Sequence, residues 1–273
     1  MADMTGKPVR IGDTALGDAL RYLRDLDWDA VYRREARSGA PEDRVLDAEA
    51  AASAAAASTA AAEAPMAATS VPARAIAVDD DRSPEERAAS LAAVAAQART
   101  CELCELARGR TNVVFASGDP NADLMIIGEG PGAQEDRQGL PFVGPAGELL
   151  TKILLAIERS RDQVYIANIV KCRPPQNRDP RPEEVAACRP YLDQQIALVR
   201  PRVIVALGRV AAQTLLGNDY PVSRLRGTWW EVGGVPVRVT YHPAALLRDA
   251  NLKRPTWEDM KIVRERLRET APA

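Results

Sequence analysis

Short apolar runs alternate with helix-like segments through the second half of this 273-residue chain. Each of four strand-like runs precedes a segment with helical periodicity. Four such units predict an α/β fold with three α/β/α layers and a central four-stranded parallel sheet. A Gly-Gly pair before the last run also predicts a hairpin. The runs are 124–127, 164–169, 203–207 and 235–241, and the helices are expected over 145–158, 182–199, 210–216 and 256–269.

The first eighty residues differ in composition from the rest. Leucines recur at near-helical spacing early in this region, so a short amphipathic helical segment is expected within residues 1–35. Residues 36–82 are rich in alanine and poor in bulky apolar side chains, which predicts a largely disordered linker. Ser83, followed by proline and two glutamates, predicts a helix N-terminus. The folded domain is therefore expected over residues 83–273.

Hydropathy and charge limit the partners of the chain. No apolar run reaches the roughly 20 residues that a membrane span needs, and the N-terminus lacks a signal-peptide pattern. We expect a cytoplasmic monomer with no membrane partner. Residues 1–100 carry 12 Lys and Arg against 17 Asp and Glu, which leaves 24 against 21 for residues 101–273. This basic excess permits contact with a polyanion, but nucleic-acid affinity requires that such groups cluster on one face.

Polar residues stand where the predicted strands end. Glu129 follows the first strand, Asn168 lies near the end of the second, and His242, the only histidine of the chain, follows the fourth. Because the carboxyl ends of parallel strands share one edge of a sheet, these three side chains are expected in one pocket. Either Asn168 or the Gly-rich loop after the first strand could be merely structural, but their coincidence with His242 favours a functional site. Phe142, between proline and glycine in the next loop, is a candidate stacking platform.

Four cysteines form a second group. Cys101 and Cys104 have the C-x-x-C spacing of metal ligands, whereas Cys172 and Cys188 lie far downstream, which fits neither a zinc ribbon nor a zinc finger. In a reducing compartment such a set indicates a metal rather than disulfides. Four thiolates suit zinc or an iron–sulfur cluster, and the residue types alone leave both open.

Four motifs together resemble the family 4 uracil-DNA glycosylases, over about residues 98–270. They are GEGPG at 128–132, GLPFVGPAG at 139–147, YIANIVKCRPPQNRDP at 165–180 and YHPAALLR at 241–248. The resemblance implies the uracil-DNA glycosylase fold and an enzyme of base excision repair. Such an enzyme hydrolyses the N-glycosidic bond of deoxyuridine in DNA, releases uracil and leaves an abasic site. It also implies uracil-containing DNA as the partner and a [4Fe-4S] cluster held by Cys101, Cys104, Cys172 and Cys188.

The resemblance implies roles for individual residues around the base. Glu129 would face the sugar and stabilise its positive charge or orient the attacking water, while His242 would donate a hydrogen bond to uracil O2. Asn168 would accept from uracil N3–H and donate to O4, a pattern that cytosine reverses at both atoms. Gly130 would contact the base through its backbone, and Glu135 would help to exclude the methyl group of thymine.

Further roles concern the DNA around the base. A base in a duplex must be flipped out before it can react, and Phe142 would stack on the flipped base. Leu246 would fill the space left in the base stack, and Arg248 would contact phosphate. Because Lys171 adjoins a cysteine and is not an obvious Schiff-base nucleophile, a monofunctional glycosylase is expected.

Two other classes of protein fit part of the sequence. One is a non-catalytic module that binds uracil or damaged DNA, against which Glu129 and His242 argue. The other is a metal–cysteine protein with a role in electron transfer or RNA binding. The metal content and an assay of base release would distinguish it from a glycosylase. The N-terminal extension exceeds what the catalytic domain needs, and any protein partner is assigned to it.

Overall fold

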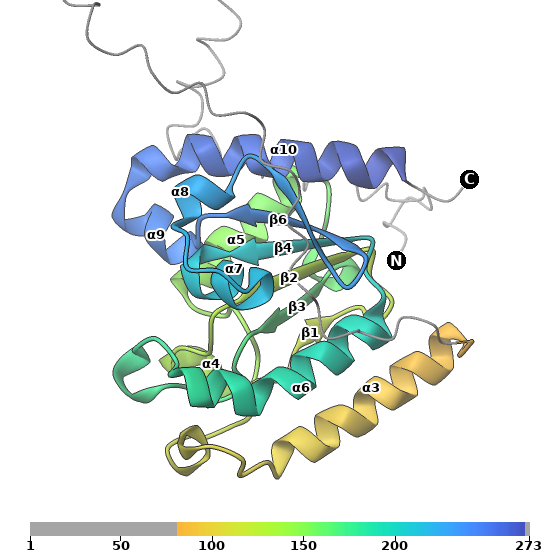
Figure 1. Cartoon of the computed structure of the whole chain (residues 1–273), viewed down its shortest axis with the longest axis vertical. Helices are drawn as coiled ribbons and strands as arrows, with labels where there is room; N and C mark the ends of the chain where they lie inside the picture. Colours follow the sequence, from red (N-terminus) through yellow and green to blue (C-terminus); the bar gives the residue numbers. More distant parts are fainter. Residues whose placement is uncertain (1–80, 271–273) are drawn as a thin grey trace, which may run out of the picture.

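The computed structural model describes residues 81–270, so the expected segment 1–35 and all but the end of the linker 36–82 lie outside the described residues. A six-stranded sheet in the order β1-β3-β2-β4-β6-β5 forms the centre of the domain (Figure 1). The four inner strands run parallel, which confirms the predicted sheet. They are β3 (Tyr165–Asn168), β2 (Leu124–Gly128), β4 (Val203–Leu207) and β6 (Val235–Thr240).

Both edge strands are antiparallel to their neighbours. Strand β5 (Trp229–Val232) pairs with β6 through the predicted hairpin, in which Gly233 and Gly234 adopt φ of 58° and 81°. Glycine suits such a turn because it adopts positive φ without a steric penalty. Strand β1 (Ser117–Gly118), beside β3, is not predicted from the sequence, because two residues are too few to produce a hydropathy pattern.

Helices cover both faces of the sheet, which confirms the three α/β/α layers (Figure 1). Helices α3 and α6 lie side by side on one face with α7 and α8, and α5, α9 and α10 cover the other. Within residues 81–270, none of the helices combines the length and the apolar content that crossing a membrane requires. The bounds are α3 (Pro84–Arg99), α4 (Ala133–Gln138), α5 (Pro145–Ala156), α6 (Pro182–Val199), α7 (Gly208–Leu216), α8 (Val222–Leu225), α9 (Pro243–Arg248) and α10 (Lys253–Glu269), with 3-10 turns at Glu105–Arg108, Arg161–Gln163, Pro175–Asn177 and Ala250–Leu252.

The start of α3 follows the predicted pattern. The Ser83 hydroxyl accepts a hydrogen bond from the Glu86 backbone N–H at 3.2 Å, and the Glu86 carboxylate accepts one from the Ser83 N–H at 2.7 Å. This reciprocal capping box satisfies two backbone donors that the first helical turn leaves unpaired. The predicted helix start at Ser83 is therefore confirmed, while the boundary of the folded domain stays a prediction.

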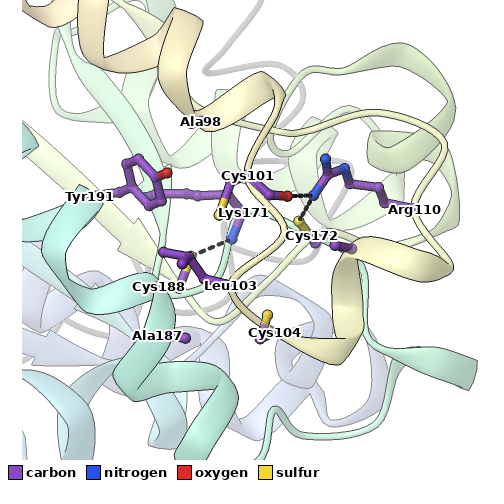
Figure 2. A pocket seen from close by; sticks show the side chains of 11 residues that line it. Ala98, Cys101, Leu103, Cys104, Arg110, Lys171, Cys172, Ala187, Cys188 and Tyr191 are labelled. Carbon is purple, nitrogen blue, oxygen red and sulfur yellow. Dashed lines mark hydrogen bonds between the residues drawn. The ribbon is translucent and has the colours of Figure 1, made fainter.

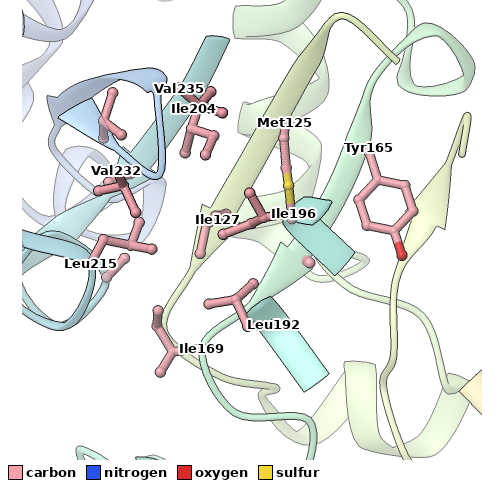
Figure 3. Packing of buried hydrophobic residues seen from close by; sticks show 14 of the residues in the cluster. Met125, Ile127, Tyr165, Ile169, Leu192, Ile196, Ile204, Leu215, Val232 and Val235 are labelled. Carbon is pink, nitrogen blue, oxygen red and sulfur yellow. The ribbon is translucent and has the colours of Figure 1, made fainter. Parts of the chain in front are cut away.

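The core is divided between the two faces of the sheet. Successive residues of a strand point to opposite faces, so Met125 and Ile127 of β2 pack on the side of α6 (Figure 3). Leu124 and Ile126 join the cluster under α5 and α10 instead. All four side chains are buried, and burying each contributes about 1.5–3 kcal/mol. Burial on both faces explains why the strands read as continuous apolar runs.

Candidate active site

The ends of the parallel strands bring the expected base-contacting residues to one edge of the sheet. Gly128 at the end of β2 pairs with Asn168 at the end of β3, and β4 and β6 end side by side in the same direction. Glu129 follows β2 directly, and His242 is the N-cap of α9 immediately beyond β6. The arrangement places an acid, a carboxamide and an imidazole at the same edge, as the strand pattern predicts.

The Asn168 carboxamide has an unused acceptor in a buried position. Its side chain is 2% exposed, and Oδ1 has no hydrogen-bond partner among residues 81–270. A Cβ atom added to Gly128 would lie 2.5 Å from Asn168 Oδ1 and 2.6 Å from Phe142 Cζ. Glycine at 128 therefore leaves room for both groups. A buried polar atom without a partner costs about 1–3 kcal/mol, so Oδ1 is an acceptor available to a ligand's N–H group.

His242 is held in a defined tautomer. Its Nδ1 accepts a hydrogen bond from the Ala244 backbone N–H at 3.1 Å, which assigns the imidazole proton to Nε2. Burial and the positive charge of Arg248 lower the pKa of His242 to about 4, although the Glu135 carboxylate opposes this. The ring is therefore neutral at pH 7 and can donate through Nε2–H.

The Phe142 ring stacks on His242 within a tightly held loop. The two ring centroids are 5.4 Å apart, with an angle of 28° between the planes. Phe142 has φ +55°, a left-handed conformation that is rare for an aromatic residue and requires support from its surroundings. Arg161 supplies it by donating from Nη1 to the Phe142 carbonyl at 3.0 Å and from Nη2 to the Pro141 carbonyl at 2.8 Å. Gly147 is also required, because its Cβ would lie 1.8 Å from the Phe142 carbonyl oxygen.

Glu135 supports the same loop from the other side. Its Oε1 accepts hydrogen bonds from the backbone N–H groups of Val143 and Gly144, each at 3.0 Å. Gly144 is the N-cap of α5, where a negative charge is favourable. The structure thus gives Glu135 a role in holding the Phe142 loop, while its exclusion of a methyl group stays a prediction.

Glu129 lies in a partly buried acidic environment. Burial raises the pKa of Glu129 to about 7, the Asp179 carboxylate adds to this effect, and Arg209 opposes it. Asp179 also forms an ion pair with Nη2 of Arg209, which belongs to the first turn of α7. Asp179 and Arg209 were missed in the sequence, because nothing in the pattern indicates that either contacts Glu129. A carboxyl group that titrates near pH 7 is typical of residues that handle protons or charge in an active site.

The structure corrects one of the expected DNA contacts. Leu246 is 1% exposed and packs in the core under α5 and α10, so it cannot also reach into DNA. Leu247, the next residue of α9, is 54% exposed. Neighbouring residues of a helix point about 100° apart, so only one of the two can face the core. Arg248 is exposed in the last turn of α9, as a phosphate contact requires.

Gly130 lies where its backbone approaches a neighbouring loop. A Cβ atom there would come within 2.8 Å of Val170 Cγ2, so a larger residue would push the two loops apart. The position is compatible with a backbone contact to the base, which stays a prediction.

The four cysteines line one pocket, although they come from three separate parts of the chain (Figure 2). Cys101 and Cys104 lie between α3 and the turn at 105–108, Cys172 lies in the loop after β3, and Cys188 lies in α6. All four are free thiols. The pocket therefore brings together four sulfur donors from segments that only the fold makes adjacent.

Nitrogen donors point at two of these sulfurs. Arg110 Nη1 lies 3.5 Å from Cys172 Sγ, and the Lys171 backbone N–H donates to Cys188 Sγ at 3.3 Å. Burial raises the pKa of the Cys172 thiol to about 11 and also raises that of Cys188. No three Cys, His, Asp or Glu side chains within residues 81–270 are arranged to hold a single metal ion. The pocket thus presents four sulfur atoms, two of them in contact with nitrogen donors.

Comparison with protein-family models identifies the superfamily of the chain. Residues 115–261 match the model of the uracil DNA glycosylase superfamily, which is more than half of the chain. This range contains Glu129, Phe142, Asn168 and His242. The chain therefore belongs to the uracil DNA glycosylase superfamily.

Similar proteins define the branch of the superfamily. The type-4 uracil-DNA glycosylase of Archaeoglobus fulgidus is 43% identical over 184 residues, which cover 64% of this chain and 92% of that protein. The type-4 enzyme of Thermotoga maritima is 44% identical over 174 residues, covering 62% and 90%. A type-5 uracil-DNA glycosylase of Pyrobaculum aerophilum is 36% identical over 166 residues, covering 55% and 72%. The chain is a member of family 4, as its motifs predict.

Proposed function

We propose that this chain is a uracil-DNA glycosylase of base excision repair, which hydrolyses the N-glycosidic bond of deoxyuridine in DNA and leaves an abasic site. Membership of family 4 supports this function. The observation that carries it is the buried, unpartnered Oδ1 of Asn168 at the same sheet edge as the neutral imidazole of His242. Together they offer an acceptor and a donor to one planar base.

Asn168 accounts for the choice of base. Its Oδ1 accepts from uracil N3–H and its amide group donates to O4, whereas cytosine presents an acceptor at N3 and a donor at C4. Both hydrogen bonds are then lost in a buried site, which can discriminate by about 10⁴-fold or more. The base reaches this pocket only after it has been flipped out of the duplex, where the Phe142 ring provides a stacking surface.

His242 and Glu129 act on the two charges that develop during cleavage. The departing base becomes negative, and Nε2–H of His242 donates to its O2 without carrying a charge of its own. The sugar becomes positive, and the ionised carboxylate of Glu129 stabilises it or orients the attacking water. Both groups follow parallel strands at the same edge of the sheet, so a single flipped-out nucleotide can contact both.

The DNA contacts follow from exposure on α9. We assign the side chain that fills the gap in the base stack to Leu247, because it is exposed where Leu246 is buried. Arg248 follows it directly and is placed to contact a phosphate. Lys171 is 2% exposed and donates from Nζ to Asn168 O and Gln195 Oε1, so it is not positioned as a Schiff-base nucleophile. A monofunctional glycosylase follows.

Cys101, Cys104, Cys172 and Cys188 would hold a [4Fe-4S] cluster. The four sulfurs around one pocket and the N–H donors on two of them suit thiolate ligands of such a cluster. A zinc ion holds thiolates about 2.3 Å from the metal. Zinc therefore stays the alternative, and the metal content of the purified protein would distinguish it from a cluster. When bound, the cluster supplies cross-links between three segments of the chain.

The cluster and the cellular setting make further predictions. Cys172→Ala should lower the yield of folded protein and its visible absorbance, and a colourless wild type that contains zinc would contradict the cluster. Cysteines that serve as metal ligands rather than in disulfides are typical of a reducing compartment, so we place the protein in the cytoplasm. We expect a monomer that acts on uracil-containing DNA, with any protein partner bound through the N-terminal extension.

The experiment that tests the function is release of uracil from a single-uracil oligonucleotide, scored by strand cleavage after alkali. Wild type should cleave only at uracil, and His242→Ala should be slower by about 10²–10³-fold because the donor to the leaving group is lost. Lys261→Met, on the surface of α10, is the matched control and should keep wild-type activity. Tight binding of uracil-DNA without base release would instead identify a binding module, and neither binding nor release would favour the metal–cysteine alternative.

A further inference from the structure

A buried lysine lies between the cysteine pocket and the base-reading asparagine. Lys171 is 2% exposed, and its Nζ donates to the backbone carbonyl of Asn168 at 2.6 Å and to Gln195 Oε1 at 2.5 Å. Burial of an ammonium group costs free energy unless hydrogen bonds replace its water. None of the catalytic steps above uses this side chain, so its contacts need another explanation.

Gln195 anchors the lysine to the rigid part of the domain. It belongs to α6 and is completely buried, and its Nε2 donates to the Phe115 carbonyl at 3.0 Å and to the Tyr165 hydroxyl at 3.1 Å. Tyr165 is the first residue of β3, the strand that ends at Asn168. The hydrogen bonds therefore run from the start of β3, through α6, back to the end of the same strand.

The backbone around Lys171 is held on both sides. Its N–H donates to Cys188 Sγ at 3.3 Å (Figure 2). Its carbonyl accepts from the Val114 N–H at 2.8 Å. Between Asn168 and Lys171, the Ile169 N–H donates to the Gly128 carbonyl at 2.9 Å. Segment 168–171 is thus fastened to the cysteine pocket at one end and to the Gly128 backbone, beside the base site, at the other.

We propose that Lys171 is a positioning residue for uracil recognition, whose Nζ fixes the Asn168 backbone carbonyl against Gln195 and thereby sets the direction of the Asn168 carboxamide. Among residues 81–270 no hydrogen bond holds Oδ1, so its direction depends on the Asn168 backbone and on packing beside Gly128. An error of about 1 Å in such a group can cost about 100-fold in rate. The inference rests on the proposed function, because it concerns the contact that reads the base.

The test compares Lys171→Met with wild type and with Lys261→Met, the surface control on α10. Methionine keeps the length and apolar stem of the side chain but removes both hydrogen bonds. At equal visible absorbance per chain and below the melting temperature, we expect inhibition by free uracil to weaken by about tenfold or more, with kcat/KM falling in parallel. Binding of DNA that already carries an abasic site should change by less than twofold, since no base is read there.

The outcomes separate this inference from the function itself. A wild type that releases no uracil would overturn the proposed function, whatever the variants do. An active wild type and a Lys171→Met variant with the same uracil inhibition constant, even with a lower Tm, would show a purely structural lysine and overturn the inference. Should Lys171→Met fail to fold or lose absorbance, Gln195→Met is the second test. It removes the acceptor for Lys171 Nζ, together with the Gln195 donor to Phe115 and Tyr165, at a position two turns along α6 from Cys188. Weaker uracil inhibition in that variant supports the inference, and an unchanged constant refutes it.

Discussion

Glu129 titrates within the range of an ordinary enzyme assay, so its environment can be tested through the pH dependence of uracil release. Burial, reinforced by Asp179, raises the pKa of Glu129 to about 7. If the reaction needs the carboxylate, the active fraction is about one-tenth at pH 6 and about one-hundredth at pH 5. The rate should therefore fall about tenfold for each pH unit below 7. A glutamate with its ordinary pKa of 4.5 would leave the rate almost constant from pH 6 to 8.

Two substitutions to neutral amides should move this profile in opposite directions. Asp179→Asn removes a negative charge beside Glu129, which lowers its pKa and raises the rate at pH 6 relative to pH 8. Arg209→Gln removes the positive charge that favours the carboxylate, so the pKa rises and the rate begins to fall at a higher pH. The pair distinguishes local charge from a general loss of structure, which would change both profiles alike.

The assay is release of uracil in a single turnover with excess enzyme, measured from pH 5 to 9 at constant ionic strength. The pKa of His242 is about 4, so this residue stays neutral over most of the range and does not distort the profile. A rate that is flat between pH 5 and 8, or a shift of both variants in the same direction, would refute the role assigned to Asp179 and Arg209.

Other predictions concern Leu247, Arg161 and the effect of the Glu129 carboxyl group on thermal stability. Leu247→Ala should slow uracil release from duplex DNA more than from single strands at unchanged Tm, whereas Leu246→Ala should lower the free energy of unfolding by about 2–5 kcal/mol, measured with denaturant. Arg161→Met releases two loop carbonyls and should slow uracil release by about tenfold or more, while Arg159→Met should not. In thermal melts, Glu129→Gln should raise Tm at pH 8 but hardly at pH 4.5. Folding raises the pKa of Glu129, so its contribution to stability is complete below the unfolded pKa and is lost as the pH rises through about 7. At pH 8 the wild type therefore carries an unfavourable buried charge that glutamine lacks.

Much of the architecture is encoded locally and can be predicted. Strands buried on both faces must be apolar throughout, so the run at 203–207 identifies β4 without knowledge of its neighbours. The capping box at Ser83 is equally local, because both partners lie within four residues. The convergence of Asn168 and His242 is also predictable, since parallel strands necessarily end at the same edge. These features depend on periodicity and chain direction, which the order of residues determines by itself.

The partners of the site residues depend on tertiary structure. Glu129 lies near Asp179 and Arg209 only because two loops and helix α7 approach the same strand end. No spacing in the sequence indicates that these three side chains are neighbours. The same holds for Lys171, whose contact with Gln195 joins a loop to a helix 24 residues away. Whether Leu246 or Leu247 is exposed depends on how α9 is rotated about its axis, because neighbouring residues point about 100° apart. Only the packing of the helix against the core determines that rotation. The sequence alone therefore determined the four parallel strands, the longer helices and the polar residues at the strand ends. Side-chain contacts between distant segments decided how those residues are charged, supported and exposed.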